Sequence, residues 1–359
     1  MRVFSIFVLF LTAAVPWTWG QAAPSPDAPP VSTVPDTPAA DAGPPRETLH
    51  VTSNLVSEYF TVRDKHNALI PYLTKNDCGV FENKQPQKVT SFVAEANQPL
   101  TLGLLIDTSG SQQYVLPLEQ QSGAAFLKRI LRPKDEAFLL SFDVGVNLEQ
   151  DYTNNTRQLE RAMNNVQINT AAGGGAAGVP GIGQGPVPVH GTPKGTLLYD
   201  AVYLASNDKL RSETGRKALI LLTDGEDQGS DTKPKAAIAA AENANAIIYV
   251  IMIADRGFYY NNGFPMGGYT GDYQMKQLAE ATGGRVINVG NNGKKLEDAF
   301  DQIEQELRTQ YLIQYVPANH EMDGRFRQVE IACHDSNQPE TLKIQARKGY
   351  FAVPDDNGQ

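Results

Sequence analysis

Five short apolar runs, separated by helical patterns, occupy residues 99–309 and narrow the choice of fold more than any other feature. Polar residues hardly interrupt these runs, as expected of strands that are buried on both faces. Between them, apolar residues recur at the spacing of amphipathic helices. The alternation predicts an α/β fold, a doubly wound and mostly parallel sheet with helices on both faces. The predicted strands are LTLGLLID (100–107), EAFLLSFD (136–143), KALILLTD (217–224), AIIYVIMIA (246–254) and RVINV (285–289).

The segments on either side of this region, 48–98 and 310–355, have a different pattern. Apolar and polar residues alternate there at period two, which is typical of strands with one buried face. Two or three strands make a marginal sheet alone, so we expect the two flanks to fold together into one small β-sandwich. Cys78 lies in the first flank and Cys333 in the second. They could form a disulfide or could both be buried thiols, because sequence does not supply the geometry of a bridge.

The N-terminus predicts export. Residues 1–23 have a basic start, a short apolar run and small residues near position 22, which is the layout of a secretory signal peptide. The run is shorter than the roughly 20 residues that span a bilayer, so no stable transmembrane segment is expected after cleavage; an uncleaved anchor is the alternative. Residues 24–47 are rich in Pro and Ala and predict a disordered linker. The mature protein is therefore expected to be periplasmic or extracellular.

The charge balance argues against nucleic acid as a partner. The net charge is −9, and no cluster of Lys and Arg interrupts the acidic composition. Phosphate backbones need such clusters. The composition itself does not indicate which other partner the protein binds.

Oxygen-bearing side chains gather where the predicted strands end. Asp107, Ser109 and Ser111 follow the first strand, Thr196 opens a helix, and Asp224 ends another strand. Ligands of open parallel sheets bind at the carboxyl ends of the strands. Oxygen donors without His or Cys suit Mg²⁺, with Ca²⁺ and Mn²⁺ as alternatives. Taken singly, Asp107 or Thr196 could instead cap a helix.

These residues carry a resemblance to a known family. DTSGS (107–111) resembles the DxSxS element of the von Willebrand factor type A domain, and the downstream Thr and Asp match the rest of its metal-ion-dependent adhesion site. The resemblance covers roughly 99–309 and implies a Rossmann-like sheet. More loosely, the chain with its flanks is similar to bacterial exported proteins called VWFA-related. The implied metal ligands, bound directly or through water, are Asp107, Ser109, Ser111, Thr196 and Asp224.

The predicted function is that of an exported, non-enzymatic module that binds a protein partner. A cation at the five side chains would capture an acidic side chain of that partner. The alternative is a structural or assembly protein in which the metal only stabilises the fold. A Mg²⁺-dependent phosphohydrolase is the third possibility, and two features argue against it. Ser109 occupies the position at which a DxDxT motif needs a second carboxylate. His190 is the only His between the flanks, so no catalytic base is in view for a serine nucleophile.

Three further features of the sequence lie near the predicted site. Asp143, at the end of the second predicted strand, is either a hydrogen-bond acceptor beside the site or a residue of a turn. The Gly-rich segment 173–191 is expected to be a surface insertion near the metal edge. The aromatic segment 256–273 is either a contact surface or a locally packed loop.

Overall fold

The computed structural model describes most of the chain after residue 54. All described residues lie within one compact unit, Thr52–Gln359. The predicted signal peptide and linker, the 173–191 segment and most of the 256–273 segment lie outside the described residues. The described ranges are 55–94, 98–168, 195–253, 271–335 and 342–352, together with the backbone of the short hairpin β10 (Tyr260–Asn261) and β11 (Phe264–Pro265).

A six-stranded sheet forms the centre of the molecule. Its strand order is β12-β9-β8-β5-β6-β7, in which the first five strands are parallel and β7 is antiparallel to β6. All five predicted strands are present, so the predicted doubly wound α/β class is confirmed. The strands are β5 (Leu100–Asp107), β6 (Glu136–Phe142), β7 (Val146–Thr153), β8 (Arg216–Thr223), β9 (Ala246–Met252) and β12 (Val286–Asn288).

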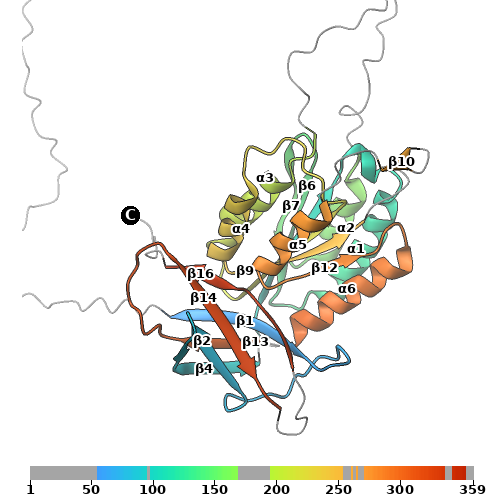
Figure 1. Ribbon diagram of the computed structural model, residues 1–359. Helices are drawn as coiled ribbons and strands as arrows, with labels where there is room; N and C mark the ends of the chain where they lie inside the picture. The colour runs from blue at the N-terminus through green and yellow to red at the C-terminus, as the bar shows by residue number, and fades with distance from the viewer. Residues whose placement is uncertain are drawn as a thin grey trace, which may run out of the picture. The chain divides into compact units, whose positions relative to one another are not determined.

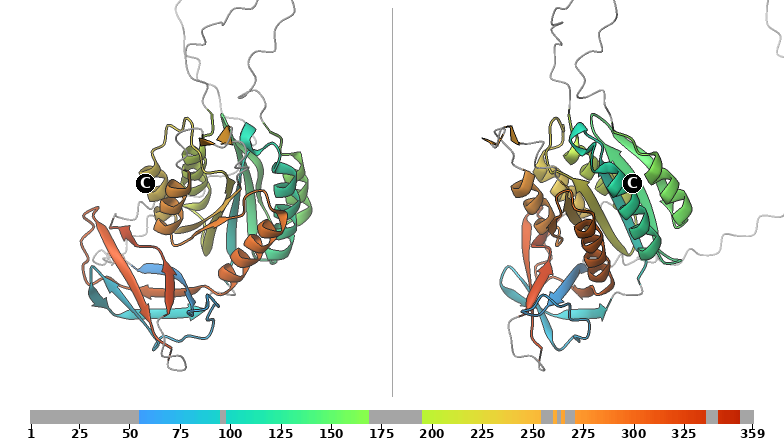
Figure 2. Two further views of the ribbon diagram at one scale, coloured as in Figure 1. Left: turned by 45° about the vertical axis from the view of Figure 1, so that its right-hand side comes forward. Right: turned by 90° about the vertical axis from the view of Figure 1, so that its right-hand side faces the viewer.

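Helices cover both faces of this sheet (Figures 1 and 2). Alternate residues of β5 enter different cores: Leu104 packs with α1, α2 and α6, and Leu105 packs with α3, α4 and α5. This two-sided burial explains why the strands read as continuous apolar runs. None of the helices in the described ranges is long and apolar enough to cross a membrane. The helices are α1 (Leu116–Ile130), α2 (Thr156–Asn165), α3 (Leu198–Leu204) with its π-helical extension η3 (Ala205–Leu210), α4 (Pro234–Asn243), α5 (Gly271–Ala281) and α6 (Gly293–Arg308).

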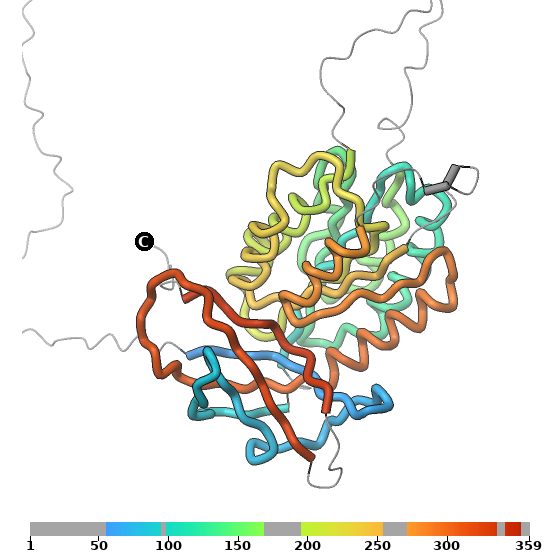
Figure 3. The backbone as a smooth tube through the Cα atoms, viewed as in Figure 1, coloured from blue at the N-terminus to red at the C-terminus, as the bar shows by residue number. Residues whose placement is uncertain are grey.

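Strands from the two flanks are interleaved in two four-stranded antiparallel sheets. One has the order β15-β1-β13-β4 and the other β16-β14-β2-β3. Each sheet therefore mixes strands from both ends of the chain, as the adjacent blue and red segments in Figure 3 show. Their inner faces share one apolar core, so the predicted sandwich is confirmed. The strands are β1 (Val56–Arg63), β2 (Cys78–Glu82), β3 (Gln85–Gln87), β4 (Val89–Ala94), β13 (Tyr311–Tyr315), β14 (Phe326–Cys333), β15 (Lys343–Ala346) and β16 (Gly349–Phe351).

Buried ion pairs connect the flank strands to the central region and to one another. Glu306 of α6 is fully buried and pairs with Arg63 of β1 and with Arg285. Glu58 of β1 is also fully buried and receives three hydrogen bonds from Arg347, which precedes β16. Only two residues separate the end of α6 from the start of β13. The Arg63–Glu306 pair thus joins the flanks to the central region, and the Glu58–Arg347 pair joins the N-terminal flank to the C-terminal flank.

The two cysteines form a disulfide. Cys78 and Cys333 are directly opposite each other in the β2–β14 pairing, with Cα atoms 4.1 Å apart and a sequence separation of 255 residues. The bridge links the two flanks across the whole central region. Of the two arrangements that the sequence left open, the disulfide is therefore the one that forms.

Reduction of this bridge should lower the free energy of unfolding by about 2–4 kcal/mol, since the cross-link restricts the unfolded chain over a long loop. Urea unfolding with and without a reducing agent measures the difference. The double variant Cys78→Ala/Cys333→Ala serves as the control and should unfold identically in both conditions. An unchanged midpoint for the reduced wild-type protein would show that the bridge adds no stability.

Candidate metal centre

Three neighbouring strands end at the same edge of the central sheet, and polar residues follow each of them. β8, β5 and β6 are adjacent and parallel. Asp107 is the last residue of β5, Asp224 follows β8 and Asp143 follows β6. All three are buried. The fold therefore collects at one edge the carboxylates that the strand-end pattern predicted.

A chain of hydrogen bonds joins four of the five predicted ligands. The Ser109 backbone N–H donates to Asp107 Oδ1 at 3.0 Å. The Ser109 and Ser111 hydroxyl oxygens are 3.0 Å apart, and Ser111 Oγ donates to Asp224 Oδ2 at 2.6 Å. The 3₁₀ turn η1 (Gly110–Gln112) sets the spacing of the two serines. The β5–α1 loop and the β8 end thus share one oxygen cluster.

Backbone hydrogen bonds connect the Thr196 segment to this cluster. Its side chain is buried, and its carbonyl accepts a hydrogen bond from Gln228 N at 2.8 Å. The next residue, Leu197, donates its N–H to the Asp143 carbonyl at 2.8 Å. Asp143 in turn accepts the Thr108 hydroxyl at 2.7 Å. The Asp143 side chain is therefore a hydrogen-bond acceptor for the DTSGS loop, and the Asp143 carbonyl links this residue to the Thr196 segment. A role of Thr196 as a ligand remains a prediction.

The cluster concentrates negative charge in a buried place. Burial, and then the charge of Asp224, raises the pKa of Asp107 from its ordinary value of 3.8 to about 7. Hydrogen bonds from Ser109 and from Thr223 Oγ1, the latter 2.7 Å from Asp107 Oδ2, act in the opposite direction and do not compensate. A cation bound between Asp107 and Asp224 would relieve this repulsion.

The donor set fits a hard divalent cation. It offers carboxylate and hydroxyl oxygens and neither imidazole nor thiolate, which is the preference of Mg²⁺, Ca²⁺ and Mn²⁺. Within the described ranges, no group of three Asp, Glu, His or Cys side chains could hold an ion by itself. An ion here would therefore depend on the serine and threonine hydroxyls and on water, as Mg²⁺ sites commonly do.

Two other acidic residues near the cluster have structural partners. Asp227 accepts hydrogen bonds from the Leu198 and Tyr199 backbone N–H groups and so caps α3. Glu226 Oε1 accepts from Gly271 N at 3.1 Å, at the start of α5. Both carboxylates hold the loop after β8 against neighbouring helices, which fixes Asp224 in place.

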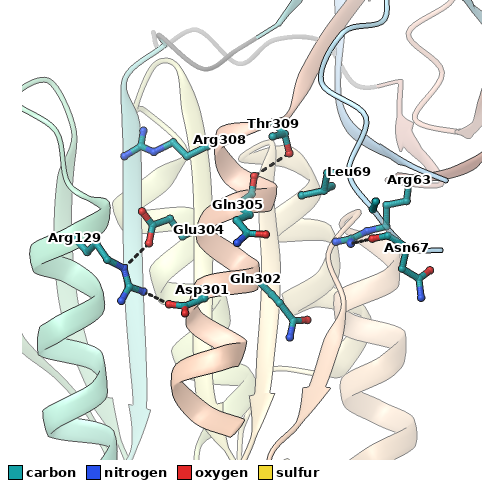
Figure 4. Close-up of a pocket in the computed structure, with 11 residues that line it drawn as sticks. Arg63, Asn67, Leu69, Arg129, Asp301, Gln302, Glu304, Gln305, Arg308 and Thr309 are labelled. Carbon is teal, nitrogen blue, oxygen red and sulfur yellow. Dashed lines mark hydrogen bonds and ion pairs between the residues drawn. The ribbon is translucent and has the colours of Figure 1, made fainter. Parts of the chain in front are cut away.

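A groove of about 910 Å³ lies elsewhere, near the amino ends of the strands (Figure 4). Arg308, which lines it, pairs with Asp135, whose other oxygen accepts from the N–H of Leu100, the first residue of β5. Arg129 reaches Asp301 and Glu304 across the groove. The charges in this groove compensate one another, unlike those of Asp107 and Asp224.

The described histidines are not close to the serines in sequence or in the sheets. His66, His320 and His334 belong to the flank segments, and His50 and His190 lie outside the described residues. No base of this type is therefore placed beside Ser109 or Ser111 within the described part of the chain.

Several residues of the centre were not predicted from the sequence. Thr223 bonds Asp107, Thr108 bonds Asp143, and the fully buried Glu119 of α1 interacts electrostatically with Asp107 and Asp224. One feature of the sequence indicates Glu119: a charged residue occupies a position of an amphipathic helix that is expected to be buried.

Comparison with known proteins gives structural neighbours only. No protein-family model matches the chain, and no curated protein is similar to it in sequence. Among solved structures, the conserved hypothetical protein BatB from Bacteroides thetaiotaomicron is 14% identical with a TM-score of 0.41, and the match covers 58% of this chain and 99% of that one. Proximal thread matrix protein 1 from the mussel byssus, in a structure with a zinc-occupied MIDAS motif, is 17% identical with a TM-score of 0.42, over 62% of this chain and 48% of that one.

A third neighbour is the PilB minor pilin from Streptococcus sanguinis, at 13% identity and a TM-score of 0.40, over 59% of this chain and 62% of the pilin. The chain thus spans about half the length of the mussel protein and less than two thirds of the pilin. These neighbours are of the von Willebrand factor type A kind. At TM-scores near 0.4, neither the function nor the ligand of a neighbour is transferred to this chain.

Proposed function

We propose that the protein is an exported, cation-dependent module that binds a protein partner through an acidic side chain. Asp107, Ser109, Ser111, Thr196 and Asp224 would hold Mg²⁺, or alternatively Ca²⁺ or Mn²⁺. The ion would supply an electrophilic position for an anionic oxygen of the partner.

The difference in depth between the carboxylates and the serines is the observation that carries this proposal. Asp107 and Asp224 are at most 1% exposed, whereas Ser109 and Ser111 are only half-buried and Gly110 between them is exposed. A site built in this way keeps its charge in the interior and presents hydroxyl oxygens to the solvent. Such a layout suits an ion that is held firmly from one side and is open to a ligand on the other.

Exposed tyrosines near this edge support a contact surface. Tyr114, in the loop after the DTSGS element, is 78% exposed. Tyr273, in the first turns of α5, is 67% exposed, and α5 begins where Gly271 bonds the loop after Asp224. Tyr offers a large rigid surface with a polar tip, and it is enriched where proteins bind other proteins.

The Cys78–Cys333 disulfide supports export, because disulfides persist in oxidising compartments. The export signal itself and its cleavage remain proposals. The proposed domain boundaries are 1–23 for the signal, 24–47 for the linker, 99–309 for the metal-binding domain, and 48–98 with 310–355 for the paired flanks.

The purified chain should recover a specific partner from envelope extract in Mg²⁺ and lose it in EDTA. Asp107→Ala should recover none in either condition, while Asp208→Ala, which removes an exposed carboxylate on η3, should behave like the wild type. Quantitative mass spectrometry of the recovered proteins is the measurement. Equal recovery with Mg²⁺ and EDTA would exclude cation-dependent adhesion. Metal-dependent thermal stabilisation without a metal-dependent partner would favour the structural alternative.

A further inference from the structure

Glu119 is a buried acid without a partner. It lies in the first turn of α1, its side chain is fully buried, and neither carboxyl oxygen has a hydrogen bond. Three other buried glutamates in the described ranges are compensated: Glu58 by Arg347, Glu306 by Arg63 and Arg285, and Glu82 by two tyrosine hydroxyls. A buried polar group that is left unsatisfied is costly and calls for an explanation.

The charges that act on Glu119 are those of the metal centre. Burial, and then the charges of Asp107 and Asp224, raises the pKa of Glu119 well above its ordinary value, and no basic side chain contributes. Three buried carboxyl groups from β5, α1 and the end of β8 are therefore electrostatically coupled without a compensating cation among the described residues.

A second unpartnered group lies next to the same loop. Gln112, directly after Ser111, is 1% exposed, and neither its amide oxygen nor its amide nitrogen has a hydrogen bond. An amide and a carboxyl that are both unsatisfied beside a hydrophilic cluster suit ordered water, which typically makes about three hydrogen bonds to such groups. Water near the cation would satisfy groups that the protein leaves without partners.

We propose that Glu119 is the third carboxylate of the cation site, supplying negative charge to the bound ion without being one of its direct ligands. The inference rests on the proposed function and deepens it. Direct ligation is not part of the proposal, because no three acidic, His or Cys side chains in the described ranges are close enough together to hold one ion. The position of Glu119 in the first turn of α1 favours a negative charge there, because the helix dipole is positive at that end.

The test compares ions of different charge. Isothermal titration calorimetry of the wild-type chain, Glu119→Gln and Glu119→Met is carried out with MgCl₂ and with TbCl₃. Both variants should bind Mg²⁺ about 10- to 100-fold more weakly than the wild type, the usual range for residues that support metal ligands. The loss for Tb³⁺ should be larger, because the Coulomb energy between Glu119 and the ion grows with the charge of the ion.

Two controls separate charge from structure. Glu82→Gln changes a buried acid of the β-sandwich and should bind both ions like the wild type. In EDTA, the two Glu119 variants should melt no lower than the wild type, because they remove a buried acid that has no partner.

The outcomes are distinguishable. Wild-type protein that binds neither ion would overturn the proposed function and this inference together. Wild-type binding with unchanged affinities in both Glu119 variants would overturn this inference alone. Equal losses for Mg²⁺ and Tb³⁺, with a lowered melting temperature in EDTA, would assign Glu119 a structural role and would also overturn it.

Discussion

Arg347→Met is expected to lower the free energy of unfolding by about 3–5 kcal/mol, the usual effect of removing one partner of a buried ion pair. Arg347 donates to both Glu58 oxygens at 2.7–2.9 Å, and it also bonds Ser57 O and Asn245 Oδ1. Burial already raises the pKa of Glu58 in spite of the guanidinium of Arg347. Without Arg347, Glu58 would be a fully buried acid that has lost its counter-charge. Equilibrium unfolding in urea measures the change.

A surface arginine provides the matched control for this variant. Arg129 also pairs with two acids, Asp301 and Glu304, but its side chain is 47% exposed. Arg129→Met should therefore change stability by about 0–1 kcal/mol, as exposed pairs do. The double variant Glu58→Met/Arg347→Met should recover much of the loss, because it removes the unpaired charge as well. If Arg347→Met and Arg129→Met had equal effects, the buried Glu58–Arg347 pair between the two flanks would contribute no more to stability than an exposed pair.

The central strands could be predicted from the sequence because both faces of the sheet are covered. Every residue of β5, β8 and β9 is buried, so each of these strands is apolar along most of its length. The edge strand β7, VNLEQDYT, was not predicted, since none of its residues is buried and polar side chains fill most of it. β7 pairs antiparallel with β6 at the edge of the sheet, and the exposed and half-buried residues along it follow no pattern that would distinguish it from a loop.

The flank strands were predictable in kind but not in arrangement. Alternation at period two indicated one buried face, as in FRQVEIAC of β14, where alternate residues are buried. The position of β1 between β13 and β15 depends on pairings across more than 250 residues. Formation of the disulfide also depends on strand register, because Cys78 lies opposite Cys333 only in the observed β2–β14 pairing.

The candidate site was predictable where one loop or strand end carried the signal. Asp107, Ser109, Ser111 and Asp224 could be named from their positions at strand ends. Their partners could not, since Thr223 bonds Asp107 across 116 residues. Glu119 occupies a position on the buried stripe of α1, where an acid is unexpected. The other residues of that stripe are Leu116, Ser122, Gly123, Phe126, Leu127 and Ile130.

Asp107→Asn should remove both the response to Mg²⁺ and a pH-dependent loss of stability. The pKa of Asp107 rises from 3.8 to about 7 on folding without metal, so the folded state binds this proton more tightly than the unfolded state. Stability is therefore greatest below about pH 4 for this group and falls as the pH rises towards 7. About three pKa units correspond to a loss on the order of 4 kcal/mol at pH 8 in EDTA. Mg²⁺ should restore part of it, about 2.7 kcal/mol at 100 times the dissociation constant.

The difference between wild type and variant is the measurement, because the pKa of Glu242 is also raised to about 7 and adds to the total pH dependence. In EDTA at pH 8, Asp107→Asn should melt higher than the wild type, and 10 mM Mg²⁺ (about 100 times a dissociation constant near 0.1 mM) should stabilise only the wild type. Asp135→Asn is the control: Asp135 lies at the other end of the strands, bonded to Leu100 N and Arg308. That variant should be less stable in every condition and should keep the full Mg²⁺ response. A Mg²⁺ response that survives in Asp107→Asn would place the cation elsewhere, because this variant removes one of the two buried carboxylates whose repulsion the ion is expected to balance.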